Sequence, residues 1–414
     1  MRKGVILTLV LGILWATIGL QSQPALAQAK GPIKIGFIAP LSGPMAATGK
    51  DMLNGVQLYL EEIGYQVAGR KIELLVEDDE ANPAVGLTKT RKLVEKDGVH
   101  IMTGGLMAST GYALAPYIDS KEIPMTYPLM APDDLTQRQR AKWIVRTGWN
   151  SSQPNHALGE YAYHVLKHRK VSIMALDYAF GWECSAGFQR TFEEAGGKIL
   201  QKIWIPLTVT DFSPYLAQIS KEADGVYVVF LARSSLQFTK QYQEFGLKAK
   251  IPLLGGGTTT DEHVLPSMGD EALGIITALH YSEALDNPAN KRFVKAFREK
   301  AKKAASYYSE NCYTGVRWII EAIKAINGDV ENRPKFLEAL KRVELKDVPR
   351  GPLRLDDYGN PIQNVYIRKV ERVGGELQNT VIYTYPNVSQ FWKWKPEEFL
   401  KNPVYSREYP PLKP

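Results

Sequence analysis

Side chains that an enzyme or a nucleotide site needs are present in this chain, but their spacing does not match such sites. The first expected strand is followed by Pro40-Leu41-Ser42-Gly43-Pro44, where a dinucleotide site has Gly-x-Gly-x-x-Gly. Gly255-Gly256-Gly257 follows another expected strand, but Thr258-Thr259-Thr260 comes next, without the lysine of a phosphate loop. The Gly-x-Ser-x-Gly turn of serine hydrolases does not occur. A catalytic triad of scattered Ser, His and Asp residues remains an alternative, although no spacing in the sequence favours one.

Metal and disulfide chemistry find equally little support. His164 and His168 are the only histidines four residues apart, and the basic residues around them favour a solvated helix face. The acidic run from Glu77 to Glu80 favours a solvated loop over a cation site. Cys184 and Cys312, each expected to open a helix, allow one bridge at most, and two separate, partly buried thiols are favoured. We therefore expect neither a cofactor nor a metal.

The elements that would position a site alternate between strands and helices. Strands are expected at 33–37, 72–76, 100–102, 123–125, 143–147, 171–176, 199–205, 226–231 and 251–254. Helices are expected at 51–63, 83–96, from 109, and at 152–167, 183–195, 212–220, 236–245, 288–301, 309–326 and 333–343. Strands at 353–355, 365–372 and 381–384 follow. Two successive blocks of this kind predict two α/β lobes, each with a mostly parallel sheet covered on both faces.

The positions just after these strands carry the side chains of a binding pocket. Ligands of parallel α/β sheets lie outside the carboxyl ends of the strands. Those positions here are 42–49, 104–110, 127–131, 177–182, 231–234 and 255–258. They hold aromatic residues, methionine, glycine and hydroxyl groups beside helix N-termini, which favour an anion. The pattern predicts a small-molecule pocket without a catalyst.

Composition and the first residues indicate an exported globular protein. The 414 residues are 44% hydrophobic and 23% charged, which suits two or three domains. Arg2 and Lys3, an apolar stretch from Val5 to Leu20 and Ala25-Leu26-Ala27 predict a signal peptide over residues 1–27, cut before Gln28. Without that segment the chain has 49 basic and 44 acidic residues, scattered rather than clustered. This balance argues against nucleic-acid binding.

The order of motifs resembles a known family. Residues 33–44 read IKIGFIAPLSGP and are followed by Gly49 and Asn54-Gly55. This opening is similar to that of the leucine/isoleucine/valine-binding protein family, the periplasmic receptors of ABC transporters. The series continues to about Val370, through Asp78-Asp79, Val145-Arg146-Thr147, Asp177–Gly181, Asp211-Phe212-Ser213, Gly246-Leu247 and Gly351-Pro352-Leu353.

The resemblance implies a type I periplasmic-binding fold, an α/β class with two doubly wound lobes joined by three crossovers. The crossovers would fall near Thr147, Ala278 and Leu353. The first lobe would then comprise 32–146 plus 279–352, and the second lobe 147–278 plus 353–385. Residues 386–414 extend past the usual end of the family and are expected to wrap the surface.

The chain resembles the family more closely in its scaffold than in the residues that contact a bound amino acid. Amino-acid binders of the family hold the ligand carboxylate with hydroxyl groups, where this chain has Ala108 and Ala131. They hold the ammonium with a tyrosine before a glycine and with a glutamate, where this chain has Phe180 and Gly257. An ammonium would lose both partners, and Gly257 would leave space. The expected ligand is therefore an apolar, aromatic small molecule, with or without a carboxylate, rather than a free α-amino acid.

Candidate ligand-binding residues follow from the strand ends and the carry-over. Phe180 and Trp182 are expected as aromatic walls, Met107 and Met130 as adaptable fillers, and Arg233 as a partner for a carboxylate. Core packing or a surface position is the competing explanation for each of them. The full set is Thr48, Met107, Ala108, Ser109, Thr110, Tyr127, Leu129, Met130, Ala131, Trp149, Phe180, Trp182, Leu231, Arg233 and Gly257.

The favoured function is that of a periplasmic solute-binding receptor of an ABC importer that is not an enzyme. It would trap a small molecule by hinge closure and be read by permease subunits in the inner membrane. One alternative is binding of a branched-chain amino acid or an amide through replaced contacts. A second is a periplasmic hydrolase or amidase, and a third is a sensor that feeds a separate signalling partner.

Overall fold

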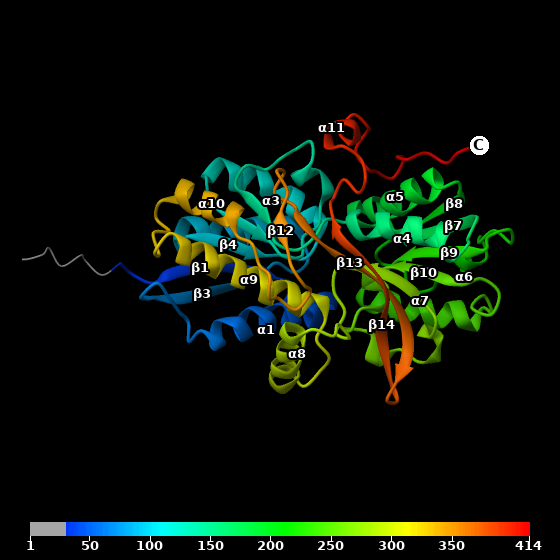
Figure 1. Ribbon diagram of the computed structural model, residues 1–414, viewed down its shortest axis with the longest axis horizontal. Coiled ribbons are helices and arrows are strands. Elements are labelled where there is room, and N and C mark those ends of the chain that lie inside the picture. Colours follow the sequence, from blue (N-terminus) through cyan, green and yellow to red (C-terminus); the bar gives the residue numbers. More distant parts are fainter. Residues whose placement is uncertain (1–29) are drawn as a thin grey trace, which may run out of the picture. The chain divides into compact units, whose positions relative to one another are not determined.

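A computed structural model describes residues 30–414 of the chain (Figure 1). The predicted signal peptide therefore lies outside the described residues. Two β-sheets organise residues 32–414. Within residues 30–414, no helix combines the length and the apolar character needed to cross a membrane.

The first sheet has the strand order β2-β3-β1-β4-β5-β6 and is parallel except for the β2–β3 pair. Its strands are β1 Ile33–Ala39, β2 Gln66–Val67, β3 Arg70–Asp78, β4 Ile101–Gly104, β5 Met125–Tyr127 and β6 Ile144–Arg146. The connecting helices are α1 Ala46–Glu62, α2 Pro83–Arg91 and α3 Ala108–Lys121. Side chains on both faces of β1 are buried, as in a sheet covered on both sides.

Three later helices return to this first lobe. They are α8 Pro288–Ala301, α9 Tyr307–Ala325 and α10 Arg333–Arg342. Helix α1 packs against α8 and α9, and α10 packs against α9 (Figure 1). Asn287 caps α8 by accepting from the Asn290 N–H, and Pro288 follows in the first helical position. This cap and proline explain why the helix starts where the sequence predicts.

The second sheet has the order β12-β13-β11-β10-β9-β7-β8, and β14 pairs with β13. Its strands are β7 Lys170–Leu176, β8 Lys198–Ile205, β9 Gly225–Val229, β10 Leu253–Gly256, β11 Ile276–Leu279, β12 Arg354–Leu355, β13 Pro361–Val373 and β14 Glu376–Val388. Its helices are α4 Gln153–His164, α5 Ala179–Glu194, α6 Ser213–Leu216 and α7 Ala232–Glu244. The strands from β7 to β11 are parallel, and β12, β13 and β14 add antiparallel pairs at one edge.

The chain passes between the two sheets three times: after β6, after β11 and before β12. Arg350, on the third passage, forms a buried ion pair with Glu310 of α9, with 2.6 Å between nitrogen and oxygen. Its guanidinium also lies 3.5 Å from the Thr147 carbonyl oxygen on the first passage. This doubly wound α/β architecture agrees with the expected fold class, while the exact lobe boundaries stay predictions.

Several element boundaries differ from the sequence prediction. Helix α5 starts at Ala179, four residues before the predicted start, so Cys184 lies inside the helix rather than at its beginning. A glycine at 181 argues against a helix from sequence alone, but a Cβ there would lie 1.9 Å from the Leu176 carbonyl oxygen. Close packing therefore requires this glycine. Helix α7 also starts early, at Ala232, and the four-residue strand β11 was not predicted.

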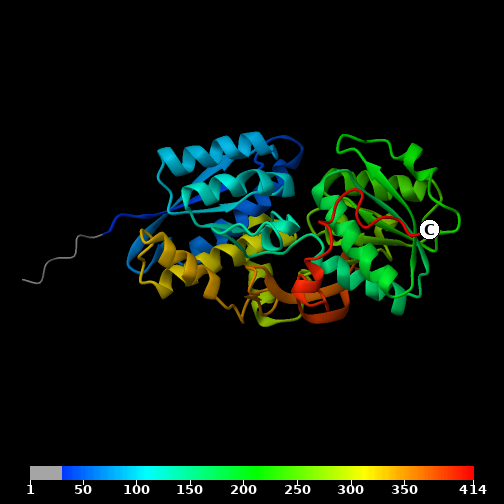
Figure 2. The ribbon, with the colours of Figure 1, turned by 90° about the horizontal axis from the view of Figure 1, so that it is seen from above.

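The C-terminal segment 386–414 lies along α4 and α5 of the second lobe (Figure 2). It contains the short helix α11 Pro396–Phe399. Phe391, Phe399 and Tyr405 of this segment form a small apolar cluster with Ala186 of α5. The Arg138 guanidinium, from the first lobe, donates to the Asn402 carbonyl oxygen at 2.6 Å. The segment is thus attached to both lobes.

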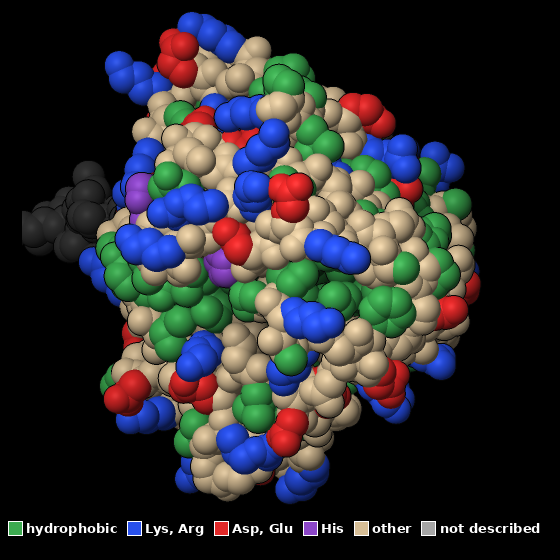
Figure 3. Space-filling view, turned by 90° about the vertical axis from the view of Figure 1, so that its right-hand side faces the viewer, with side chains coloured by type: hydrophobic (Ala, Val, Ile, Leu, Met, Phe, Trp, Pro, Cys, Tyr) green, Lys and Arg blue, Asp and Glu red, His purple; other side chains and the backbone are tan. Residues whose placement is uncertain are grey.

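Charge on the surface is mixed. Figure 3 shows one face of the molecule, on which lysine and arginine side chains are spread out with acidic side chains between them. They form no continuous basic stripe on this face, which agrees with the scattered charges of the sequence.

Candidate ligand-binding site

A small cavity lies where several strand ends and helix N-termini of both lobes meet. Segments after β4, β5, β7, β9 and β10 contribute to it, as expected for a ligand site in parallel α/β sheets. The start of α9 completes the wall. The cavity is lined by Leu106, Met107, Ala108, Leu129, Ala131, Trp149, Tyr178, Phe180, Leu231, Thr258, Tyr307 and Tyr308.

None of the twelve side chains that line this cavity carries a formal charge. Among these side chains, hydrogen-bonding groups are the phenol hydroxyls, the indole N–H of Trp149 and the Thr258 hydroxyl, which donates to the Phe230 carbonyl oxygen at 2.7 Å. Burial is the main cause that raises the pKa of Tyr178 and Tyr307 well above the ordinary value, and it raises the pKa of Tyr308 as well. These phenols therefore stay protonated at physiological pH and are neutral hydrogen-bond donors.

The aromatic rings are packed against one another. The Trp149 ring lies 5.7 Å from the Phe180 ring and 5.8 Å from the Tyr307 ring, both nearly edge to face. The Tyr307 and Tyr308 rings lie 4.0 Å apart. These distances hold the wall in a defined arrangement, because edge-to-face and offset pairs are the favoured geometries of aromatic side chains.

Helix N-termini direct positive potential at this cavity. Helices α3, α5, α7 and α9 all begin beside it, at Ala108, Ala179, Ala232 and Tyr307. The caps of α3 and α5 make no side-chain hydrogen bond, and the first turns of these two helices contain no acidic residue. The first intrahelical bond of α3 runs from the Gly111 N–H to the Met107 carbonyl oxygen, so the preceding N–H groups are free of intrahelical bonds. Such ends attract an anion.

The open space inside the cavity is small. It amounts to about 20 Å³, which is the room of a single water molecule. The walls are therefore close together, and a larger ligand needs the two lobes to separate before it enters. Met107, which lines the cavity, is a side chain that adapts its shape at low cost.

Seven of the predicted site residues line this cavity. They are Met107, Ala108, Leu129, Ala131, Trp149, Phe180 and Leu231. Ser109 and Thr110 follow in the first turn of α3, and the buried Thr110 hydroxyl has no hydrogen-bond partner. These two residues are adjacent to the lining without forming part of it.

Three predicted residues, Trp182, Arg233 and Thr48, lie outside the lining, because their side chains point away from the cavity. Phe180 and Trp182 are two residues apart on α5, a rotation of about 200°. The Trp182 indole N–H donates to Asp177 at 2.8 Å instead. Arg233 lies in the first turn of α7 and is exposed. Thr48 is buried on α1, with its hydroxyl 3.4 Å from His263 Nε2.

Gly257, Tyr127 and Met130 also lie outside the lining. The prediction that Gly257 leaves free space is wrong, because a Cβ there would lie 2.6 Å from the Leu279 Cβ. Tyr127 is fully buried, and its hydroxyl donates to the Gly111 carbonyl oxygen at 2.9 Å. Met130 is fully buried and packs where a Cβ on Gly105 would be.

Five lining residues were not predicted. Leu106, Tyr178 and Thr258 lie within the predicted strand-end segments, but they were not in the set of candidate ligand-binding residues. Tyr307 and Tyr308 come from the start of α9, which no strand precedes. Ser306 caps this helix by accepting from the Ser309 N–H, and that cap signal was the available clue.

Polar contacts also join the two lobes outside the cavity lining. The Tyr112 hydroxyl of α3 donates to Glu183 of α5 at 2.7 Å, and Asp51 of α1 lies 2.8 Å from His263. Burial raises the pKa of Glu183 well above the ordinary value and that of Asp133 to about 6. Arg146 donates to the carbonyl oxygens of Met130, Trp149 and Pro132.

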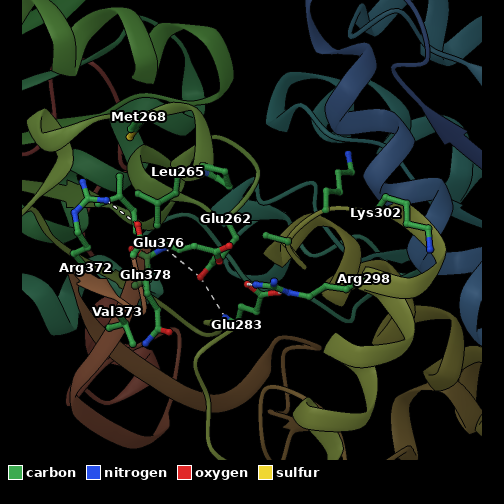
Figure 4. A pocket seen from close by; sticks show the side chains of 16 residues that line it. Glu262, Leu265, Met268, Glu283, Arg298, Lys302, Arg372, Val373, Glu376 and Gln378 are labelled. Carbon is green, nitrogen blue, oxygen red and sulfur yellow. Dashed lines mark hydrogen bonds and ion pairs between the residues drawn. The ribbon is translucent and has the colours of Figure 1, made fainter.

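A second cavity, of about 510 Å³, lies between α8 and the β13–β14 hairpin (Figure 4). It contains none of the predicted site residues. Two of its charged groups have partners: Arg298 binds Glu283 at 2.7 Å, and the Glu262 carboxylate accepts from Asn379 at 3.2 Å. Charged groups of both signs make this cavity less suited to an apolar ring than the first one.

Metal chemistry finds no support at either place. Across residues 30–414, no group of three or more His, Cys, Asp or Glu side chains is arranged to hold a metal ion. Cys184 and Cys312 are both buried free thiols. Burial raises the pKa of each thiol well above the ordinary value, so neither is a reactive thiolate.

Comparison with known proteins identifies similar chains along most of the length. Residues 32–376 match the family described as periplasmic binding protein. The Leu/Ile/Val-binding protein homolog 6 of Brucella suis biovar 1 (strain 1330) is 31% identical over 361 residues, which cover 85% of this chain and 91% of that protein.

Two solved structures from Rhodopseudomonas palustris are also similar. The solute binding protein of an ABC transporter from strain BisB5, in complex with 3,4-dihydroxy benzoic acid, has a TM-score of 0.82 and 33% identity. A second solute binding protein from this organism, in complex with benzoate, has a TM-score of 0.81 and 29% identity. Each match covers 87% of this chain and 98% of the other.

Proposed function

Because the chain belongs to the periplasmic binding protein family, we propose that it is the solute receptor of an ABC importer and that its ligand is an aromatic carboxylate. The ligand binds between the two lobes, in the cavity where α3, α5, α7 and α9 begin. The receptor performs no chemistry on it. The proposed location is the periplasm, and the proposed partner is a permease of the inner membrane.

The single observation that supports this ligand class is the uncharged, aromatic lining beside uncapped helix N-termini. A carboxylate gains from the helix ends and from neutral phenol donors. An ammonium would find no carboxylate on the lining, and an unpaired buried charge costs several kcal/mol. A free α-amino acid brings both groups, so the lining favours an acid without the amine.

The carboxylate and the ring would occupy different parts of the cavity. The free N–H groups of the first turn of α3 are the proposed carboxylate donors, with the unpartnered Thr110 hydroxyl beside them. A hydrogen bond to a charged group contributes about 1.5–3 kcal/mol. The ring would lie against Phe180 and Trp149, where an aromatic pair adds roughly 0.5–1.5 kcal/mol beyond area burial.

A flat ring also suits the narrow space. The walls of the cavity lie close together. A planar ligand is thin enough for this space and still buries a large apolar area as the lobes close. The two Rhodopseudomonas palustris proteins in complex with benzoate and 3,4-dihydroxy benzoic acid, at about 30% identity to this chain, support the same ligand class.

The test is a binding screen of the exported chain by calorimetry and thermal unfolding. We expect benzoate or a substituted benzoate to bind with a dissociation constant of about 1 μM or tighter. A hundredfold excess over that constant should stabilise the native state by about 2.7 kcal/mol. Leucine, isoleucine and valine should give no shift at the same concentration. Tight binding of these amino acids with no response to aromatic acids would contradict the proposal.

Branched-chain amino acid binding is the second candidate. The similar protein of Brucella suis is named a Leu/Ile/Val-binding protein homolog, and that name favours it. In that case a tyrosine hydroxyl, such as that of Tyr178 or Tyr307, would have to accept from the ammonium. The same screen separates the two candidates, because the amino acids and the aromatic acids are measured side by side.

A further inference from the structure

Trp149 lines the cavity, and the His280 ring packs against Trp149 and Tyr307. Each of these two residues, Trp149 and His280, has a buried polar atom without a hydrogen-bond partner. One is the indole nitrogen Nε1 of Trp149, and the other is Nδ1 of His280. The two side chains are 2% and 1% exposed, so water does not reach these atoms from the surface. A buried polar atom without a partner costs about 1–3 kcal/mol of folding free energy unless something binds it. Such atoms next to a ligand cavity therefore indicate ligand contacts.

The two residues belong to one group of rings. The Trp149 ring lies 5.5 Å from the His280 ring, and the Tyr307 ring lies 5.8 Å from Trp149 and 6.1 Å from His280. Trp149 and Tyr307 line the cavity. Trp149 lies on the first passage between the lobes and His280 on the second, so this group forms the hinge end of the site.

The neighbours of His280 define which of its nitrogens carries the proton. Asn311 donates its amide to the Pro128 carbonyl oxygen at 2.8 Å, so its Oδ1 atom faces His280 as an acceptor. His280 Nε2 lies 2.8 Å from that oxygen and must donate to it. Burial, with Arg350 as the next cause, lowers the pKa of His280 well below the ordinary value, so the ring is neutral. Its Nδ1 atom is then a free acceptor.

We propose that the ligand carries a hydroxyl group on its aromatic ring, which accepts from Trp149 Nε1 and donates to His280 Nδ1. A hydroxyl group is both a donor and an acceptor, and it satisfies a free donor and a free acceptor that belong to neighbouring side chains. This inference rests on the proposed function and deepens it, because it names the substituent that the receptor selects. Trp149 and His280 are then specificity-determining residues.

Other substituents satisfy only part of the pair. A methyl group or a fluorine atom at the same ring position fills the space but leaves His280 without a donor. An amino group donates to His280 but accepts poorly from Trp149. A site built to bind a hydroxyl group discriminates strongly against analogues that lack it, because its own buried atoms then stay unpaired.

The experiment measures the dissociation constants of the full exported chain for matched benzoates by calorimetry. Benzoate is compared with its 3- and 4-hydroxy, 3- and 4-fluoro and 3- and 4-methyl derivatives. We expect one hydroxy isomer to bind roughly 10–100-fold more tightly than the fluoro and methyl derivatives at the same position. Equal binding of the hydroxy, fluoro and methyl derivatives would overturn the inference while leaving the proposed function in place. Failure of every aromatic acid, benzoate included, would overturn both.

A variant assigns the effect to Trp149. Trp149→Phe keeps an aromatic ring and removes the donor, so the preference for the hydroxy over the fluoro derivative should fall at least about fivefold. Trp143→Phe is the matched control, since Trp143 is also buried but does not line the cavity. It should keep the wild-type preference. If Trp149→Phe, folded by its thermal transition, retains the full hydroxyl preference, the inference is wrong.

Discussion

At the scale of single residues, two aromatic side chains on one helix turn distinguish the observed site from the one expected from sequence. Phe180 lines the cavity and contacts Trp149, whereas Trp182 donates to Asp177. Both residues looked equivalent in sequence, because each flanks Gly181. The helical rotation between them decides which ring faces the ligand.

Substitution of these two residues tests that assignment. Phe180→Ala should weaken binding of the aromatic acid roughly 10–100-fold, because it removes a ring contact and leaves apolar surface of the ligand uncovered. Trp182→Ala is the control and should change the affinity less than about threefold. Calorimetry of both variants with the tightest ligand provides the measurement. A larger loss from Trp182→Ala than from Phe180→Ala would contradict the observed geometry.

Asp79 gives a prediction about pH. The expectation that the acidic run from Glu77 to Glu80 is a solvated loop is wrong for this residue, which is buried. Burial raises its pKa from 3.8 to about 6, its Oδ1 atom accepts from the Ala81 N–H, and its Oδ2 atom has no partner. Between pH 4 and pH 6 the unfolded chain loses this proton while the folded chain keeps it. The free energy of unfolding therefore decreases as the pH rises through this range and stays lower above it.

Asp79→Asn keeps the acceptor for Ala81 and removes the ionisation. At pH 8 the variant should be more stable than the wild type by about 1–3 kcal/mol. The difference should vanish below about pH 3, where Asp79 is protonated in both the folded and the unfolded chain. Chemical denaturation of the two proteins at several pH values measures this difference directly. A constant difference across pH 4–8 would show that Asp79 does not titrate in this range.

At the scale of secondary-structure elements, the C-terminal segment 386–414 connects parts of the molecule that are distant in sequence. Phe399 packs with Phe391, Tyr405 and Ala186, and the Arg138 guanidinium holds the Asn402 carbonyl oxygen. The His156 ring nitrogen lies 3.2 Å from the Tyr405 hydroxyl. We therefore expect this segment to stabilise the fold.

Phe399→Ala measures that contribution. It should lower the free energy of unfolding by about 3–5 kcal/mol, as is typical when a buried phenylalanine is truncated. Lys401→Ala, at an exposed position two residues away, should change it by less than about 0.5 kcal/mol. Denaturant titrations of both variants provide the test. An effect of Phe399→Ala no larger than that of the control would mean that the segment detaches in solution.

The sequence predicts the elements of this molecule better than its site. The strand and helix pattern and the ordered motifs define two α/β lobes, because apolar periodicity depends on local residues. The starts of α5 and α7 depend on close packing at Gly181 and on backbone geometry at Leu231, which periodicity does not report. Tyr307 and Tyr308 enter the site from a helix about 130 residues further along the chain than Phe180, and only the tertiary fold brings them together.

At the scale of the whole molecule, ligand affinity depends on how readily the two lobes close. The apparent affinity of a receptor is reduced by the fraction of molecules that have the competent conformation. In the present conformation, the Tyr112 hydroxyl of α3 in the first lobe donates to Glu183 of α5 in the second lobe at 2.7 Å. It also accepts from the Asp134 N–H at 3.2 Å. Neither Tyr112 nor Glu183 lines the cavity.

Tyr112→Phe should therefore weaken the binding of every ligand by the same factor. The lost interlobe hydrogen bond amounts to about 1–2 kcal/mol, which corresponds to a roughly 5–30-fold change in a closing equilibrium. Tyr117→Phe is a matched control on the same helix, because the Tyr117 hydroxyl donates to Glu95 within the first lobe and not across the lobes. Calorimetry with benzoate and its hydroxy derivatives gives the factor for each ligand, and small-angle scattering without ligand should show a larger radius of gyration for Tyr112→Phe alone. A factor that differs between ligands would mean that Tyr112 acts on the pocket itself. Equal effects of the two variants would mean that the interlobe hydrogen bond does not contribute to closing of the lobes.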